Sequence, residues 1–330
     1  MRSARSAASR ERPAPHRPHL LPTEYVSALA GIGITDGGGI PFPAWSAETA
    51  LVVMDDNSIQ AAVTSISAPG VHFEDTAFAR DLVPCCNEVA ARLAGDHPKR
   101  FGAFATLPLP DVKGALLELE YALDILQLDG VVLLASQSDG RYLGDPNFDD
   151  LVAELDRRAA VVFVHPTIPK SVEAVPIDVP AFASEFPFDT SCPILNLIWS
   201  GTVERLPNVR GIFSYAGATA PFLAWRWSLL NLHPTMLEPA AVGVMHYLGQ
   251  LLYDTALSAN PHALRSLLEL VGPSQVVFWS DYPFAPAPLH GASVRSPASF
   301  DGFDAPKRRA IERDNALVLL PGLRAQLERA

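Results

Sequence analysis

The sequence predicts a (β/α)8 barrel, and three observations support this fold. Short apolar runs alternate with longer segments of helical pattern along most of the 330 residues. The runs are nearly continuous in Val, Leu and Phe, which is typical of parallel strands that are covered on both faces. Residues with catalytic chemistry follow or close several runs, namely His165, Tyr215, Asp254 and Asp281. Because the carboxyl ends of barrel strands converge on one mouth, these side chains are predicted to share a pocket.

The first segment is the hardest to fit to this fold. Residues 1–18 are predicted to be a disordered basic tail, since arginines dominate its start and no apolar stretch of a secretory signal follows. Seven strands follow Pro22, so a complete barrel must take its first strand from Ala14–Leu21. Pro15 and Pro18 would remove two hydrogen-bond donors from that strand. Whether it forms is left open.

The remaining elements are predicted to build one barrel domain over residues 19–330. A small loop insertion is expected at Gly31–Pro43, which is ordered because it carries apolar residues among its glycines and prolines. The predicted strands are Ala61–Ser67, Phe101–Leu107, Gly130–Ala135, Ala160–His165, Val209–Tyr215, Gln250–Asp254 and Val276–Asp281. The predicted helices begin near Ser46 or cover Asp75–Ala94, Asp111–Leu126, Asn147–Arg158, Pro193–Leu206, Ala218–Leu232, Pro261–Val271 and, broken at Pro321, Ala305–Arg329.

Composition limits the classes of partner. A formal net charge of -11, with acidic residues spread along the chain, argues against binding to nucleic acid or to anionic lipid. None of the apolar stretches approaches the roughly 20 residues of a membrane helix. Three cysteines without a CxxC pair fit the reducing cytoplasm. A small-molecule partner is therefore expected.

Several segments together carry a family resemblance that covers the chain from Leu20 to about Leu320. They are GIPFPAWS, SISAPGVHF, FATLPLPD, DGRYLGDPNFDDLVAELDRR, VVFVHPT, FPFDT, YDTALSANPHAL and SDYPFAP. With these segments the chain resembles the amidohydrolase-related decarboxylases, the group of aminocarboxymuconate-semialdehyde decarboxylase and methylsalicylate decarboxylase. The resemblance implies a metal-dependent (β/α)8 barrel of the amidohydrolase type that removes a carboxylate without an organic cofactor.

The resemblance also implies a set of site residues. The family's metal ligands are a first-strand pair, a histidine closing strand five and an aspartate closing strand eight, which match Arg17 with His19, His165 and Asp281. The family's acid/base histidine is replaced by Tyr215 in the segment SYAGA. Eleven positions later, Arg226 matches an arginine that binds the substrate carboxylate, in relatives across a dimer interface. A divalent metal, expected to be zinc on His19, His165 and Asp281, is implied.

Two of these positions depart from the family's pattern. Arginine stays protonated and cannot ligate a cation, so Arg17 leaves at most three protein ligands, which still suffice for catalytic zinc. Arg17 could swing away from a weakened metal site, or replace the metal and supply its positive charge. The chemistry could also have decayed. Tyr215 can donate a proton, but with an ordinary pKa near 10 it is a poorer base than histidine.

The sequence therefore predicts a lyase acting on a small aromatic or polyketide-derived carboxylic acid, working as a cytoplasmic homodimer. Asp281 and Tyr215 would handle the proton, with Arg17 as the third catalytic candidate, and Arg226 would hold the carboxylate. Trp45 and Phe188 are candidates for an aromatic pocket wall, although ordinary packing explains them equally well. The alternatives are a metal-free cyclase, dehydratase or isomerase, and a binding or partner subunit without turnover.

Overall fold

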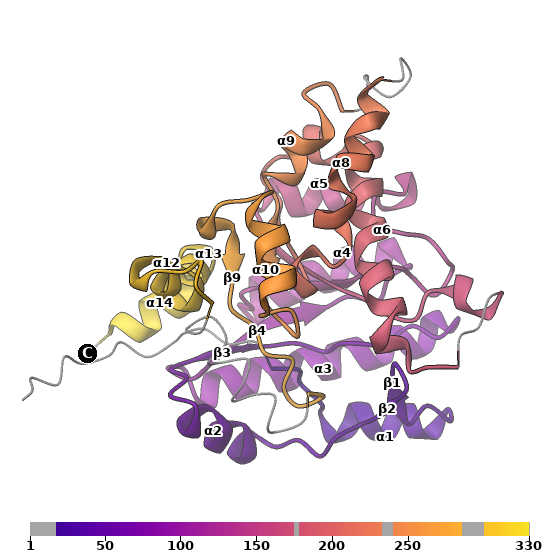
Figure 1. The fold of residues 1–330 in the computed structure, drawn as a ribbon. Coiled ribbons are helices and arrows are strands. Elements are labelled where there is room, and N and C mark those ends of the chain that lie inside the picture. The colour runs from indigo at the N-terminus through magenta and orange to yellow at the C-terminus, as the bar shows by residue number, and fades with distance from the viewer. Residues whose placement is uncertain (1–17, 175–177, 233–239, 286–299, 330) are drawn as a thin grey trace, which may run out of the picture.

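The computed structural model describes residues 18–174, 178–232, 240–285 and 300–329. Its centre is a seven-stranded parallel sheet in which strands are neighbours in sequence order, from β3 to β9, with helices packed around it (Figure 1). The strands are β3 (Ala62–Thr64), β4 (Phe101–Thr106), β5 (Gly130–Leu134), β6 (Val161–His165), β7 (Arg210–Phe213), β8 (Leu252–Asp254) and β9 (Val276–Val277). The order and direction of these strands fit the predicted α/β barrel.

The eighth position of the barrel holds no regular strand in the described part of the chain. His19 forms a single parallel bridge with Ser65, next to β3. The His19 amide donates to the Tyr282 carbonyl (2.6 Å), and the Leu20 amide donates to the Ser65 carbonyl (2.7 Å). This segment thus lies between the two ends of the sheet without a ladder. A full strand over Ala14–Leu21 is not confirmed, because residues 14–17 are outside the description and Pro18 cannot donate.

The predicted loop insertion is ordered and contains a two-residue hairpin. Strands β1 (Asp36–Gly37) and β2 (Ile40–Pro41) pair antiparallel within it. Before it, helix α1 (Thr23–Gly31) was not predicted, and it buries Tyr25 and Leu29 against the core. After it, Ser46 caps helix α2 (Ala47–Asp56), as expected, by accepting a hydrogen bond from the Thr49 amide.

The remaining helices follow the predicted alternation, except that the helix at Val244–Leu248 was not predicted and one boundary was wrong. They are α3 (Thr76–Asp96), α4 (Val112–Glu120), α5 (Asp149–Arg157), α6 (Glu185–Trp199), α7 (Thr202–Arg205), α8 (Ala220–Ser228), α9 (Val244–Leu248), α10 (Pro261–Leu268), α12 (Ala305–Arg309), α13 (Asn315–Leu319) and α14 (Pro321–Glu328). Helix α6 begins eight residues before the predicted start at Pro193, which was wrong because that proline lies inside the helix. The predicted break at Pro321 is confirmed by the start of α14.

Short turns with helical hydrogen bonds connect several of these elements. Among them are η3 (Lys170–Glu173), η5 (Tyr215–Gly217) and η6 (Leu229–Leu232). Figure 1 places α8 and α9 at the opposite end of the molecule from α1 and α2, and α12 to α14 together at one side. Among the described helices, none is both long and apolar enough to cross a bilayer.

Candidate active site

The candidate site lies at the carboxyl ends of the central strands, where apolar runs give way to ionisable residues. His165 is the last residue of β6, a strand whose five residues are all buried. Tyr215 begins η5, directly after β7 and Ser214, and Asp281 follows the buried segment after β9. Since parallel strands end on the same edge, the fold brings these side chains together with His19, which lies between the sheet's two ends.

His19, His165 and Asp281 form a compact cluster that could hold a metal ion. One ligand atom from each lies within 4.8 Å of the others, and all three side chains are buried. The rings of His19 and His165 meet edge to face with centroids 4.9 Å apart. His19 Nε2 lies 2.9 Å from Asp281 Oδ1. Two ligand atoms bound tetrahedrally, each about 2.1 Å from a cation, lie about 3.4 Å apart, so a shared ion would widen this contact by about 0.5 Å.

The hydrogen bonding of His165 also fits a ligand role. Its Nδ1 lies 2.6 Å from the Pro166 carbonyl oxygen, which can only accept. Nδ1 therefore carries the proton and Nε2 keeps its lone pair, which is the tautomer that a metal-binding histidine needs. The described residues thus supply two imidazoles and one carboxylate of suitable geometry for a divalent cation.

Tyr215 is held beside this cluster by a strained backbone. Its φ is 58°, in the left-handed region that is costly for a residue with a side chain. Its amide donates to Asp254 Oδ1 at 2.7 Å, and the same oxygen accepts from the Ala256 amide at 3.1 Å. The centroids of the Tyr215 and His165 rings are 6.3 Å apart. Asp254, at the end of β8, thus fixes the turn that directs Tyr215 toward the cluster.

A mainly apolar cavity of about 290 Å³ opens above these residues, and we call it the first cavity. Its lining residues are His19, Gly37, Ile40, Ser67, Ala68, His165, Phe182, Phe186, Tyr215, Leu257, Asp281, Phe284 and Ala285. Three phenylalanines and Ile40 provide flat apolar walls, while the polar groups gather at the cluster. Such a cavity suits one aromatic ring that carries a polar substituent.

The structure brings only some of the predicted site residues into this cavity. Arg226 is exposed on α8 and lies outside the described lining. Trp45 is half-buried and packs against the core, again outside that lining. Phe188 is 56% exposed, whereas Phe186 on the same helix lines the cavity. Arg17 falls outside the described residues.

The aromatic lining was only partly visible in the sequence. Residues two apart on a helix point about 200° away from each other, so Phe186 and Phe188 cannot both face the cavity once α6 begins at Glu185. Had the helix been predicted to begin before Phe186, its periodicity would have shown that Phe186 and Phe188 lie on opposite faces. Phe182, Leu257 and Phe284 lie on connections between elements, where periodicity gives no signal.

Comparison with known proteins gives consistent matches over nearly the whole chain. A family model described as amidohydrolase matches residues 19–322. The chain is 33% identical over 318 residues to 6-methylsalicylic acid decarboxylase of Penicillium expansum, covering 94% of this chain and 97% of that protein.

Solved structures give matches of similar extent. A crystal structure of amidohydrolase II superposes with a TM-score of 0.85 at 31% identity, covering 93% of this chain and 98% of the other. A dihydroxybenzoic acid decarboxylase from Polaromonas sp. JS666, crystallised with manganese and the inhibitor 2-nitroresorcinol, superposes with a TM-score of 0.79 at 21% identity. The match covers 96% of this chain and 97% of the decarboxylase chain.

Proposed function

This chain belongs to the amidohydrolase family, and from that membership we propose that it is a carboxy-lyase acting on a small aromatic acid of the 6-methylsalicylic acid type. In this reaction the bond between the ring carbon and the carboxylate carbon breaks. The electron pair stays on the ring carbon, which takes up a proton, and carbon dioxide leaves. With 6-methylsalicylic acid the other product would be 3-methylphenol.

The buried cluster of His19, His165 and Asp281 beneath the aromatic walls of the first cavity carries this proposal. An aromatic acid placed against Phe186 and Phe284 would direct its carboxylate and neighbouring hydroxyl toward the cluster. A divalent cation bound there would polarise that hydroxyl as a Lewis acid. Two imidazoles and a carboxylate suit zinc, which we assign as the metal.

Proton transfer is assigned to Tyr215 and Asp281. The Tyr215 ring stands beside His165 and lines the same cavity, so its hydroxyl can protonate the ring carbon as the carboxylate leaves. Asp281, whose Oδ1 lies 2.9 Å from His19 Nε2, takes the proton of the substrate hydroxyl as the acid binds and returns it when the neutral phenol is released, and solvent water reprotonates Tyr215. Phe182, Phe186 and Phe284 exclude water from the reacting carbon.

A metal-free enzyme is the second candidate, because arginine at position 17 replaces a ligand that the family's pattern supplies. In that case Arg17 provides the positive charge that a substrate carboxylate needs. Metal analysis of protein purified without chelator separates the two. Arg17→His adds a neutral imidazole, so it should raise metal content if the wild type holds well under one equivalent. A full equivalent in the wild type would exclude the metal-free enzyme.

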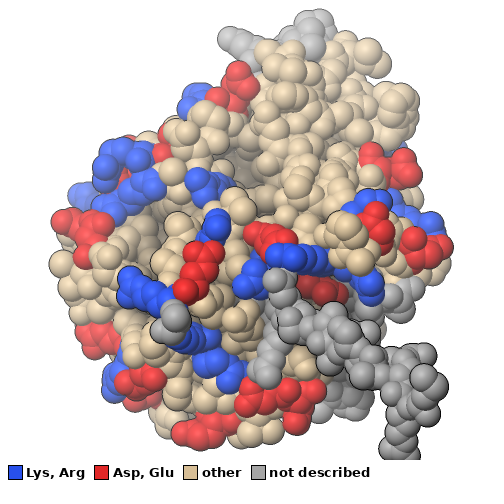
Figure 2. Space-filling view, turned by 90° about the vertical axis from the view of Figure 1, so that its left-hand side faces the viewer, with Lys and Arg blue, Asp and Glu red and all other residues tan. Residues whose placement is uncertain are grey.

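We also propose that the protein is a homodimer, and that the apolar α8–α9 face forms the interface. This face consists of Phe222, Trp225, Leu229, Leu232, Val242 and Met245, which are 42% to 83% exposed. Figure 2 shows few charged side chains toward the end of the molecule where Figure 1 places α8 and α9. Such a patch is unusual on a monomer. Arg226 lies within it in sequence, so a partner's α8 would carry that arginine to the interface.

The decarboxylation test is direct. Purified protein incubated with 6-methylsalicylic acid should release carbon dioxide and 3-methylphenol in equal amounts, measured by chromatography and by carbonate trapping. Absence of both products, with folded and metal-loaded protein, would contradict the carboxy-lyase assignment.

The dimer test uses one residue of the α8–α9 face and a matched control. Trp225→Glu places a charge in the centre of the face and should convert dimer to monomer in light scattering. Leu117→Glu is the control, since Leu117 on α4 is 69% exposed and outside this face. A wild-type monomer at micromolar concentration would contradict the dimer.

We further assign the protein to the cytoplasm, because Cys85, Cys86 and Cys192 are all free thiols.

A further inference from the structure

A second cavity, of about 380 Å³, lies next to the first and shares Ser67 with it. The connections after β3, β4, β5 and β6 surround it, and its volume is within the range of small-molecule sites. None of the described residues of the metal cluster lines it. It is therefore distinct from the metal cluster, although it adjoins the first cavity.

The walls of the second cavity combine apolar side chains with buried hydroxyls. Val71, Leu107 and Val132 are among its apolar residues, and Thr106 and Ser136 are each more than nine-tenths buried. Within the described part of the chain, Thr106 Oγ1 has no hydrogen-bond partner. A buried hydroxyl without a partner is costly. Rotation about the Cα–Cβ bond exchanges the threonine methyl and hydroxyl, so this group can serve a ligand in the cavity.

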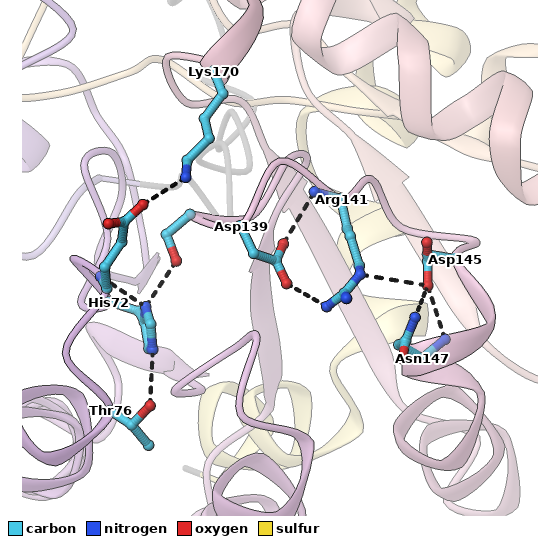
Figure 3. Close-up of polar contacts among 9 residues, drawn as sticks. His72, Thr76, Asp139, Arg141, Asp145, Asn147 and Lys170 are labelled. Carbon is cyan, nitrogen blue, oxygen red and sulfur yellow. Dashed lines mark hydrogen bonds and ion pairs between the residues drawn. The ribbon is translucent and has the colours of Figure 1, made fainter.

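The rim of the second cavity is electrically neutral. Glu74 and Lys170 are the formally charged residues of the described lining, and they pair at 2.5 Å (Figure 3). The hydrogen bond to Lys170 lowers the pKa of Glu74, and the same bond raises the pKa of Lys170, so both stay charged. Lys170 therefore offers no unneutralised positive charge to a carboxylate.

His72 adds no positive charge to this lining. Its Nδ1 accepts from the Glu74 amide at 3.2 Å and lies 2.7 Å from Ser138 Oγ, so the proton is on Nε2, 3.3 Å from Thr76 Oγ1 (Figure 3). Burial lowers the pKa of His72, although nearby carboxylates oppose this effect. The imidazole is thus neutral and ties together the connections after β3 and β5.

A thin wall separates the two cavities. Ser67 lines both of them. Gly38 lines the second cavity, and the ring of Phe186, which lines the first, packs directly against it. A side chain at Gly38 would collide with that ring, and its φ of 70° also favours glycine. The shared wall places a ligand of the second cavity one layer away from the reacting centre.

We propose that the second cavity binds a neutral phenol, the class of molecule that decarboxylation releases. An aromatic acid is an anion and is better served by a cation at the cluster. A phenol has an apolar ring for the Val71, Leu107 and Val132 walls and a hydroxyl for Thr106. That the phenol is the enzyme's own product rests on the proposed function. The cavity's preference for a neutral hydroxylated ring does not.

Calorimetric titration of the full chain with 3-methylphenol tests the proposal. Wild-type protein should bind two molecules per chain, and saturating benzoate should displace one and leave the other. Thr106→Val should weaken the benzoate-resistant site about 3- to 10-fold, the effect of losing one hydrogen bond. Thr202→Val is the control, because Thr202 is 3% exposed and lies outside the described lining of both cavities.

A second variant keeps the test valid if Thr106→Val does not fold. Ile168 lines the second cavity and is 46% exposed, so Ile168→Trp should fold and obstruct the cavity, abolishing benzoate-resistant binding. A wild type that binds no 3-methylphenol once benzoate is saturating would overturn the proposal. So would unchanged binding in both variants. If two sites are found but 6-methylsalicylic acid releases no carbon dioxide, the neutral-phenol site stands and its identification as a product site fails.

Discussion

The two halves of the barrel mouth carry different chemistry on the same scaffold. Strands β3, β4 and β5 lead to hydroxyl and apolar side chains, with Ser67, Thr106 and Ser136 near their ends. Strands β6 to β9 lead to ionisable ones, namely His165, Tyr215, Asp254 and Asp281. Of these seven residues, Tyr215 and Asp281 adopt left-handed φ values of 58° and 65°.

We infer from this difference that the β6–β9 half carries the reaction and that the β3–β5 half binds a neutral ligand. Strained backbone persists only where the surrounding structure holds it, and it is concentrated at sites of function. Among the strand-end residues it occurs at Tyr215 and Asp281, where ionisable groups face one another. On the β3–β5 half it occurs away from the strand ends, at Glu74 on the connection after β3, with a φ of 62°. A substitution on the β6–β9 half should therefore change turnover, whereas one on the β3–β5 half should change binding of a neutral ligand.

The largest effect is expected at Asp281. Asp281→Asn removes a carboxylate from the cluster while keeping a similar shape, so kcat/KM should fall by roughly 10³-fold or more, with loss of bound metal. Activity assays and metal analysis on the same preparation measure both. Asp139→Asn is the control on the other half, because Asp139 follows β5 and pairs with Arg141 at the surface. Equal activity of Asp281→Asn and wild type would remove the distinction between the halves.

Tyr215 should come next. Tyr215→Phe keeps the ring beside His165 and removes only the hydroxyl, so a proton donor predicts a loss of roughly 10²-fold in kcat. Tyr215→His should retain decarboxylation, because imidazole is the group that the family's pattern places there. Wild-type turnover of the Phe variant would reduce Tyr215 to a cavity wall and leave the proton to Asp281.

The central strands could be predicted from the sequence because their signal is local. Buried parallel strands require continuous apolar runs, and Val161–His165 and Phe101–Thr106 are both fully buried. Helix α1 was missed because it joins a proline-rich start to a glycine-rich loop and has a proline at its N-cap. The strand at the eighth position was uncertain for a physical reason, since Pro18 cannot donate there.

The site was predictable only in part. His165 and Asp281 stand out as polar residues that end apolar runs, and burial of such groups needs a compensating partner. The choice of Phe186 over Phe188 depends on the helical register of α6, which Pro193 obscured. The second cavity has no sequence signal, because Thr106 and Ser136 look like ordinary strand ends until four connections fold around them.

Asp189 is a buried carboxylate of the β6–β9 half that does not line either described cavity. It accepts from the Thr167 amide at 2.8 Å, and burial raises its pKa to about 6. The folded protein therefore holds this proton more tightly than the unfolded chain. Its favourable contribution is present below the ordinary value near 3.8 and is lost as pH rises from about 4 to 6.

Asp189→Asn should consequently raise the free energy of unfolding at pH 7.5 by about 1 to 3 kcal/mol and change it little at pH 4. The amide oxygen can still accept from Thr167. Urea denaturation at the two pH values measures the difference, and turnover should stay within about twofold because no reacting group is touched. Asp56→Asn, at an exposed position on α2, is the control. An equal effect at both pH values would show that the pKa of Asp189 is not raised.

Among the residues assigned to the reacting half, the smallest loss of kcat is expected at Asp254, which acts through the backbone of Tyr215. Asp254→Asn keeps an oxygen that can accept from the Tyr215 and Ala256 amides, so kcat should fall only about 3- to 10-fold, with KM unchanged. Asp254→Ala leaves two buried amides unpaired and should approach the loss of Tyr215→Phe. If Asp254 works by aiming Tyr215, Asp254→Asn should add nothing in a Tyr215→Phe background, because the group being aimed is already gone. Additive losses in the double variant would instead give Asp254 its own role in the reaction, and the ionisable half of the mouth would then hold a further reacting group.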